Sequence, residues 1–92
     1  MALLQANKDL ISTGMKEFNA LLNQQVFSDP LISEEAMVTI VNDWISFYIN
    51  YYEQQMTGEQ QEQERALQEF QQKLNTLAIP FLDKYRAFLK SL

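Results

Sequence analysis

The strongest constraint on the fold is the stretch 33–56, SEEAMVTIVNDWISFYINYYEQQM, which contains no glycine or proline. It holds the only tryptophan, three of the four tyrosines and one phenylalanine. Wound as an ideal helix at about 100° per residue, its apolar side chains cover roughly 220° of the circumference, against roughly 100° for an ordinary surface helix. Such a helix needs neighbours on two sides.

The apolar residues of this helix form two adjoining stripes. The first consists of Met37, Ile40, Val41, Trp44, Phe47, Tyr48 and Tyr51. The second consists of Val38, Ile45, Ile49, Tyr52 and Met56. Several of these residue types also favour strands, but the run lacks strict alternation and is too long for one strand, so a helix is predicted.

Composition extends this prediction to the whole chain. Two glycines and two prolines among 92 residues are too few for the turns of a sheet protein, and this length suits a single domain, 1–92. We therefore predict an all-α antiparallel bundle. The absence of cysteine and histidine excludes disulfides, thiolate and imidazole catalysis and the common zinc sites. No cofactor or metal is expected.

Targeting signals and net charge limit the expected cell compartment and the class of partner. The N-terminus has no cationic start and only a short apolar run, and no stretch reaches the length of a membrane span, so a soluble cytoplasmic protein is expected. A net charge of −5 argues against nucleic acid as a partner. Acids dominate 28–69 and bases dominate 70–92. Helix-dipole preferences explain this asymmetry; a charged patch that selects a partner is the alternative.

Two further helices can cover the central one. Apolar spacing predicts a helix at about 2–25, in which Gly14 on the apolar face indicates close approach of another helix, under the Trp44 ring. The connection 26–32 is apolar apart from the turn formers in 28–30 and is expected to cap one end of the bundle. Ser33 is the predicted N-cap of the central helix, which spans about 33–56.

The third helix begins after a short turn. Thr57 and Gln60 fit a capping box at its start. Because the link is so short, the helices on either side of it are antiparallel neighbours. Pro80 breaks helical hydrogen bonding, and we predict a kink or break near Ile79, giving helices at about 59–78 and 80–91. The apolar phase nevertheless continues through Pro80. The alternative is therefore an unbroken helix whose end, with Leu82, Phe88 and Leu89, needs a second subunit as cover.

Acidic pairs are the only candidates for catalysis. Adjacent side chains such as Glu34 and Glu35 diverge on a helix and cannot converge on one substrate, and the acids in 59–64 are interpreted as solvated surface. No phosphate-binding loop or nucleophile motif is present. The chain is predicted not to be an enzyme.

The candidate interaction residues lie at the edges of the central helix and near the C-terminus. The aromatic cluster is interpreted mainly as core, but surplus apolar surface is expected at one edge, Phe47 with Tyr51, or at the other, Ile49 with Met56. The bases of the amphipathic segment 81–92 complete the candidate surface: Lys84, Arg86 and Lys90.

These observations favour a small non-catalytic module that binds another protein, or a second copy of itself, through apolar helix faces. An adaptor, an inhibitor, a regulatory protein and an accessory subunit all fit this description. The alternative is peripheral association with lipid through the basic amphipathic segment 81–92.

Overall fold

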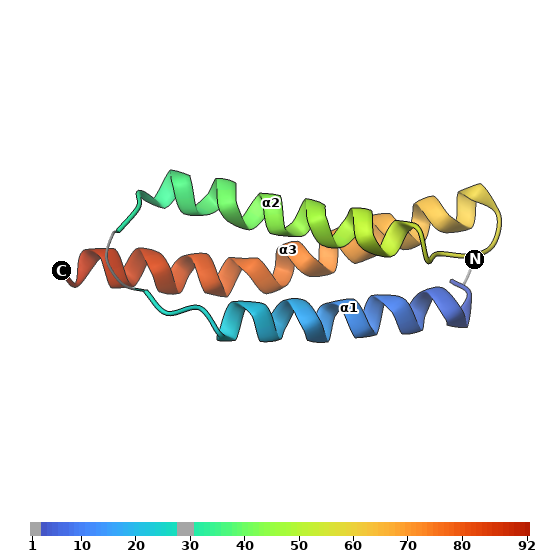
Figure 1. The fold of residues 1–92 in the computed structure, drawn as a ribbon, viewed down its shortest axis with the longest axis horizontal. Helices are drawn as coiled ribbons and strands as arrows, with labels where there is room; N and C mark the ends of the chain where they lie inside the picture. Colours follow the sequence, from blue (N-terminus) through green and yellow to red (C-terminus); the bar gives the residue numbers. More distant parts are fainter. Residues whose placement is uncertain (1–2, 28–30) are drawn as a thin grey trace.

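The computed structural model describes residues 3–27 and 31–92 and contains three helices in this part of the chain. They are α1 (Gln5–Asn23), α2 (Glu34–Glu53) and α3 (Gln60–Lys90). Figure 1 shows α2 running antiparallel to both α1 and α3 in an elongated bundle of 50 × 19 × 18 Å. The all-α prediction is confirmed, and α1 and α2 lie within their predicted ranges.

α3 is one continuous helix of 31 residues that passes through Pro80. The predicted division into a third and a short fourth helix at 59–78 and 80–91 is therefore wrong. Phe81 and Tyr85, beyond the proline, are buried on the same face as Phe70 and Leu74 before it. Burial of this continuous apolar face outweighs the helical hydrogen bond that Pro80 cannot form.

The C-terminal part of α3 is covered by the connection between α1 and α2. The ring of Phe27 lies 4.9 Å from that of Tyr85, 5.4 Å from Phe88 and 5.6 Å from Phe81, measured between centroids. The Tyr85 hydroxyl donates to the Ile32 carbonyl at 2.7 Å and accepts from the Ile32 amide at 3.2 Å. The connection therefore covers Phe88, one of the three residues for which an unbroken helix was expected to need a second subunit.

One residue of the connection departs from the predicted end cap. Val26 is 83% exposed and does not contribute to it. Leu82 and Leu89 of α3 are half-buried. The predicted turn formers, residues 28–30, lie outside the described residues. Beyond them, Ser33 caps α2 as predicted, because its hydroxyl accepts from the Ala36 amide at 3.1 Å.

The turn between α2 and α3 is held by a buried residue of α1. Asn7 is fully buried; its amide nitrogen donates to the Thr57 carbonyl, and its amide oxygen accepts from the Thr57 N–H, both at 2.9 Å. Glu59 is the N-cap of α3, without a side-chain cap bond, and Gln60 donates to Glu64. The predicted capping box is therefore wrong: the bonds from Asn7 hold Thr57 outside the helix.

α1 and α3 approach closely at Gly14. A Cβ at this position would collide with the Phe70 ring and would lie 3.2 Å from Tyr52. The predicted close approach is therefore confirmed, but the ring is Phe70 of α3. Trp44 lies farther along the bundle, with its ring centroid 6.2 Å from that of Phe81.

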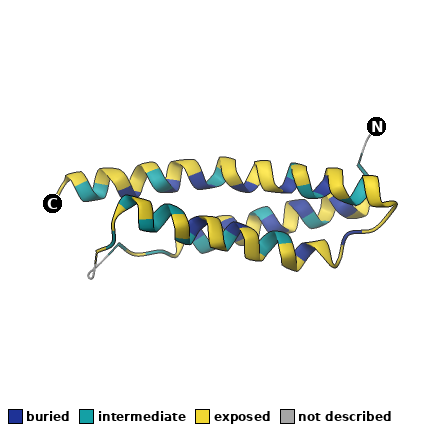
Figure 2. Cartoon of the chain, turned by 90° about the horizontal axis from the view of Figure 1, so that it is seen from above, coloured by how far each residue is buried: buried dark blue, intermediate teal, exposed yellow. Residues whose placement is uncertain are grey.

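The core runs along the inner faces of all three helices, where Figure 2 shows the buried residues. α3 packs closely against α1 and α2, whereas α1 and α2 approach each other over a shorter stretch. The largest fully buried side chains are Phe18, Phe70, Leu74, Val41 and Asn7.

Candidate protein-interaction surface

The two predicted edges of α2 differ in exposure. Phe47 is 67% exposed and Tyr51 is 56% exposed, and they lie four residues apart, so they share one side of the helix. Met56 on the other edge is buried at 6% exposure, and Ile49 is half-buried. The surplus apolar surface of α2 is therefore the pair Phe47 and Tyr51, which we call the aromatic edge.

The aromatic edge rests on rings of the bundle. Phe47 stacks with Tyr51 at 6.5 Å and 15° between ring planes, and it meets Tyr48 edge-on at 6.1 Å. Tyr48 in turn packs edge-on against buried Phe18 of α1 at 5.3 Å, and Tyr51 packs against Tyr52 at 5.1 Å. The exposed rings are thus supported from below by half-buried and buried ones.

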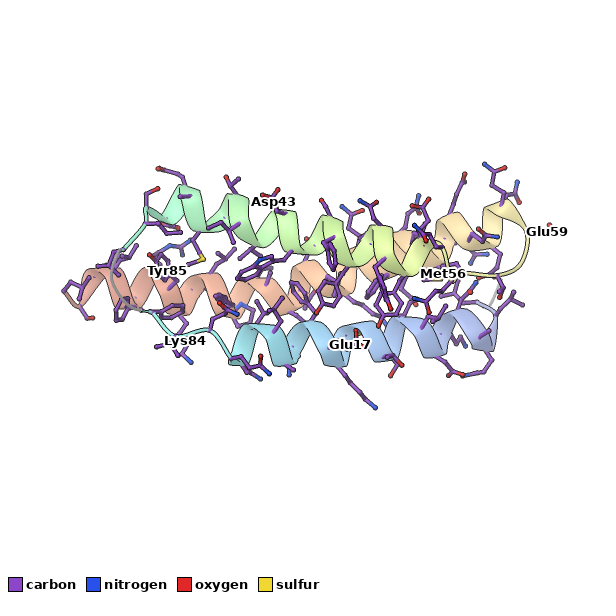
Figure 3. All side chains as sticks on the ribbon, viewed as in Figure 1. Glu17, Asp43, Met56, Glu59, Lys84 and Tyr85 are labelled. Carbon is purple, nitrogen blue, oxygen red and sulfur yellow. The ribbon has the colours of Figure 1, made fainter. Side chains whose placement is uncertain are left out.

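A hydrogen bond joins α1 to α2 beside this edge. The hydroxyl of Tyr52 donates to a carboxylate oxygen of Glu17 at 2.7 Å; Glu17 lies midway along α1 in Figure 3. Burial, and then this hydrogen bond, raise the pKa of Tyr52 above its usual 10.0. Burial followed by the Glu17 charge raises the pKa of Tyr48. Both hydroxyls therefore stay neutral to a higher pH than an ordinary tyrosine does.

The three predicted basic residues do not form one patch. Arg86 donates to Glu34 of α2 at 2.6 Å and to Asp83 at 3.1 Å. Lys84 lies against a groove between α1 and α3 (Figure 3), about 200° around the helix from Arg86. Lys90 is in the last turn of α3.

The segment 81–92 directs its apolar side into the protein. Phe81 and Tyr85 are buried, and Phe88 is half-buried against Phe27. Within 3–27 and 31–92, no helix has the length and apolar content needed to cross a membrane. Across the same residues, no three acidic side chains gather as they would around a metal ion.

Comparison with known proteins assigns the chain to a family. A family profile described as alpha-haemoglobin stabilising protein matches residues 5–91. The chain belongs to the alpha-haemoglobin stabilising protein family. Alpha-hemoglobin-stabilizing protein of Bos taurus is 77% identical over 91 residues, covering 99% of both chains.

Two further members of the family are similar over nearly the whole chain. The Homo sapiens protein is 74% identical and the Mus musculus protein 66% identical, each over 91 residues that cover 99% of this chain and 89% of the relative. The alpha-haemoglobin stabilising protein family is non-catalytic and binds another protein. Membership therefore confirms two predictions from the sequence, a protein-binding role and the absence of enzymatic activity.

Sequence reasoning missed two polar contacts of this bundle. Nothing in the local sequence links Glu17 to a tyrosine 35 positions later. Asn7 had a detectable signal, because an amide on the apolar face of a helix needs partners once buried. Its partner, the Thr57 backbone, is 50 positions away and follows only from the packing.

Proposed function

We propose that this chain binds alpha-haemoglobin and stabilises it, and that the aromatic edge is the centre of the contact. Three curated relatives with 66–77% identity carry the name alpha-hemoglobin-stabilizing protein. The observation that carries the proposal for the site is the 67% exposure of Phe47. A ring of this size left in water is a free-energy cost that a partner surface removes.

The support beneath the aromatic edge favours tight binding. Phe47 and Tyr51 are already stacked, and Tyr48 packs on Phe18 below them. Aromatic side chains also have few rotatable bonds, so little conformational entropy is lost when a partner covers them. Rings of this kind commonly contribute most of the binding free energy at the centre of an interface.

Polar groups around the aromatic edge define the partner surface further. Asp43 precedes Phe47 by four residues, so the two share one side of α2, and Asp43 is exposed (Figure 3). Asn50 and Gln54, also exposed, continue this side. The complementary partner surface is an apolar depression with a basic group at its rim.

The substitution Phe47→Ala tests the site. We expect it to weaken binding to isolated alpha-haemoglobin by at least about tenfold, as for a central aromatic residue of an interface, in isothermal titration calorimetry. The free energy of unfolding should change by no more than about 0.5 kcal/mol because the ring is mostly exposed. Urea denaturation of the free protein provides this second measurement.

Ile79→Ala is the matched control, because Ile79 is an exposed apolar residue, at 59%, on α3. We expect it to leave affinity unchanged. Equal losses for Phe47→Ala and Ile79→Ala, or no loss for Phe47→Ala, would refute the aromatic edge as the contact. Light scattering of the free chain separates a third outcome: self-association abolished by Phe47→Ala would assign the edge to a second copy.

A further inference from the structure

A groove of about 400 Å³ lies on a different side of the molecule, between α1 and α3 at the level of Pro80. Its apolar lining consists of Leu22 of α1, Phe27 of the connection, and Leu77, Pro80 and Phe81 of α3. We call it the Pro80 groove. Its volume falls within the range of about 300–1,000 Å³ that is typical of small-molecule sites.

The rim of the Pro80 groove carries polar groups that the fold does not use. The side chains of Asn19, Asn23 and Lys84 have no hydrogen-bond or ion-pair partner among the residues that the structure describes. Pro80 has no amide hydrogen, so the carbonyl of Thr76 lacks its usual helical donor. Polar groups placed around an apolar floor are the features that orient a bound small molecule.

Charge at the Pro80 groove favours an anion. Among the described residues that line this groove, Lys84 is the one that carries a charge, and it has no ion-pair partner in the described chain. An unpaired ammonium group at the rim of an apolar groove attracts an anion.

We propose that the Pro80 groove binds a small apolar carboxylate, with the carboxylate at Lys84 and the hydrocarbon body against Leu77 and Phe81. One ammonium group on its rim matches a single negative charge. A nucleotide or another polyphosphate would need several bases at this position. This site is separate from the aromatic edge, so it does not depend on how the proposed protein partner binds.

A matched pair of probes tests the proposal: 2-naphthoate and its uncharged analogue 2-naphthamide. With about 13 non-hydrogen atoms, naphthoate should bind the full chain with a dissociation constant on the order of 1 mM. In ¹H–¹⁵N NMR titrations we expect saturable shifts confined to the backbone amides of 76–84 and 19–27 and the side-chain amides of Asn19 and Asn23. Naphthamide should bind more weakly.

Lys84→Gln separates charge recognition from apolar contact. It should weaken naphthoate binding about three- to fivefold, the usual size of an exposed charge contact, and leave naphthamide binding unchanged. Lys90→Gln removes a lysine of the same helix outside the groove and should alter neither affinity.

Three results would overturn the proposal. One is the absence of saturable shifts up to about 10 mM naphthoate. Another is a set of shifts centred on Phe47 and Tyr51, which would mean that the probe binds the aromatic edge. The third is equal weakening of naphthoate and naphthamide by Lys84→Gln, which would mean that charge is not recognised.

Discussion

The interface between α1 and α3 and the interface between α1 and α2 border the same helix, yet they are filled differently. At the first, Gly14 lets the Phe70 ring lie directly against the α1 backbone. At the second, the rings of Phe18, Tyr48 and Tyr52 fill the space between the helices, and α1 and α2 approach each other over a shorter stretch. Phe70 is completely buried at the first interface, and Phe18 and Tyr52 are buried at the second, but the neighbouring Phe47 and Tyr51 of α2 stay exposed.

The difference separates the contacts that stabilise the bundle from the surface that we propose for recognition. A glycine permits the close contact that buries the ring of α3. Gly14 also meets the Tyr52 ring of α2, but α2 carries more rings than the bundle can cover, and Phe47 and Tyr51 stay exposed. The uncovered rings are then available to another protein.

Phe70→Ala should have the largest effect. The ring is fully buried at 0% exposure, so its removal should lower the free energy of unfolding by about 3–5 kcal/mol. Urea denaturation followed by circular dichroism measures this value. Tyr51→Ala, at the aromatic edge, is the control. A loss of stability of similar size there would mean that the exposed edge contributes as much to stability as the buried ring of Phe70.

Gly14→Ala should have a smaller effect of the same sign. The added methyl group meets the Phe70 ring, and such overpacking lowers the free energy of unfolding by about 1–3 kcal/mol. The better helix propensity of alanine offsets about 1 kcal/mol of this loss. A net loss of up to about 2 kcal/mol is expected in thermal and urea unfolding.

Thr13→Ala is the neighbouring control for Gly14→Ala, because Thr13 lies about 100° around α1 from Gly14 and is exposed. It should be neutral or slightly stabilising, since alanine is the better helix former. If Gly14→Ala proved as harmless as Thr13→Ala, the α1–α3 interface would be looser than the structure indicates.

Tyr52→Phe should have the smallest effect at neutral pH. It removes the hydrogen bond to the exposed Glu17 carboxylate while it keeps the ring, so the free energy of unfolding should fall by about 0.5–1.5 kcal/mol. Paired urea unfolding curves of the wild type and the variant at neutral pH measure the difference.

The pH dependence of Tyr52→Phe gives a sharper test. Burial, then the bond to Glu17, hold the pKa of folded Tyr52 above its usual 10.0, so above pH 10 the unfolded chain loses this proton more readily than the folded one. The stability that this hydroxyl contributes is therefore complete below about pH 10 and is lost as pH rises further. From about pH 8 to about pH 10.5 the wild type should lose more stability than Tyr52→Phe. Parallel losses would mean that Tyr52 is not the titrating group.

The sequence by itself determined the helical class and the main helices. Their apolar spacing has a helical period, and glycine and proline are nearly absent, so local geometry alone excludes a sheet. Ser33 and the acids after it marked the start of α2, because an N-cap acts within one turn. The surplus of apolar surface on α2 was also readable, since its arc is wider than one neighbour can cover.

Only the tertiary structure decided which part of that surface stays exposed. Met56, just beyond the end of α2, is buried in the core, whereas Phe47 lies on a side of α2 that the bundle leaves exposed. The same kind of long-range packing carries α3 through Pro80, since Phe27 covers the far end of the helix. Asn7 and Glu17 form hydrogen bonds with residues 50 and 35 positions away. Contacts at such separations depend on how helices pack, and no local pattern encodes them.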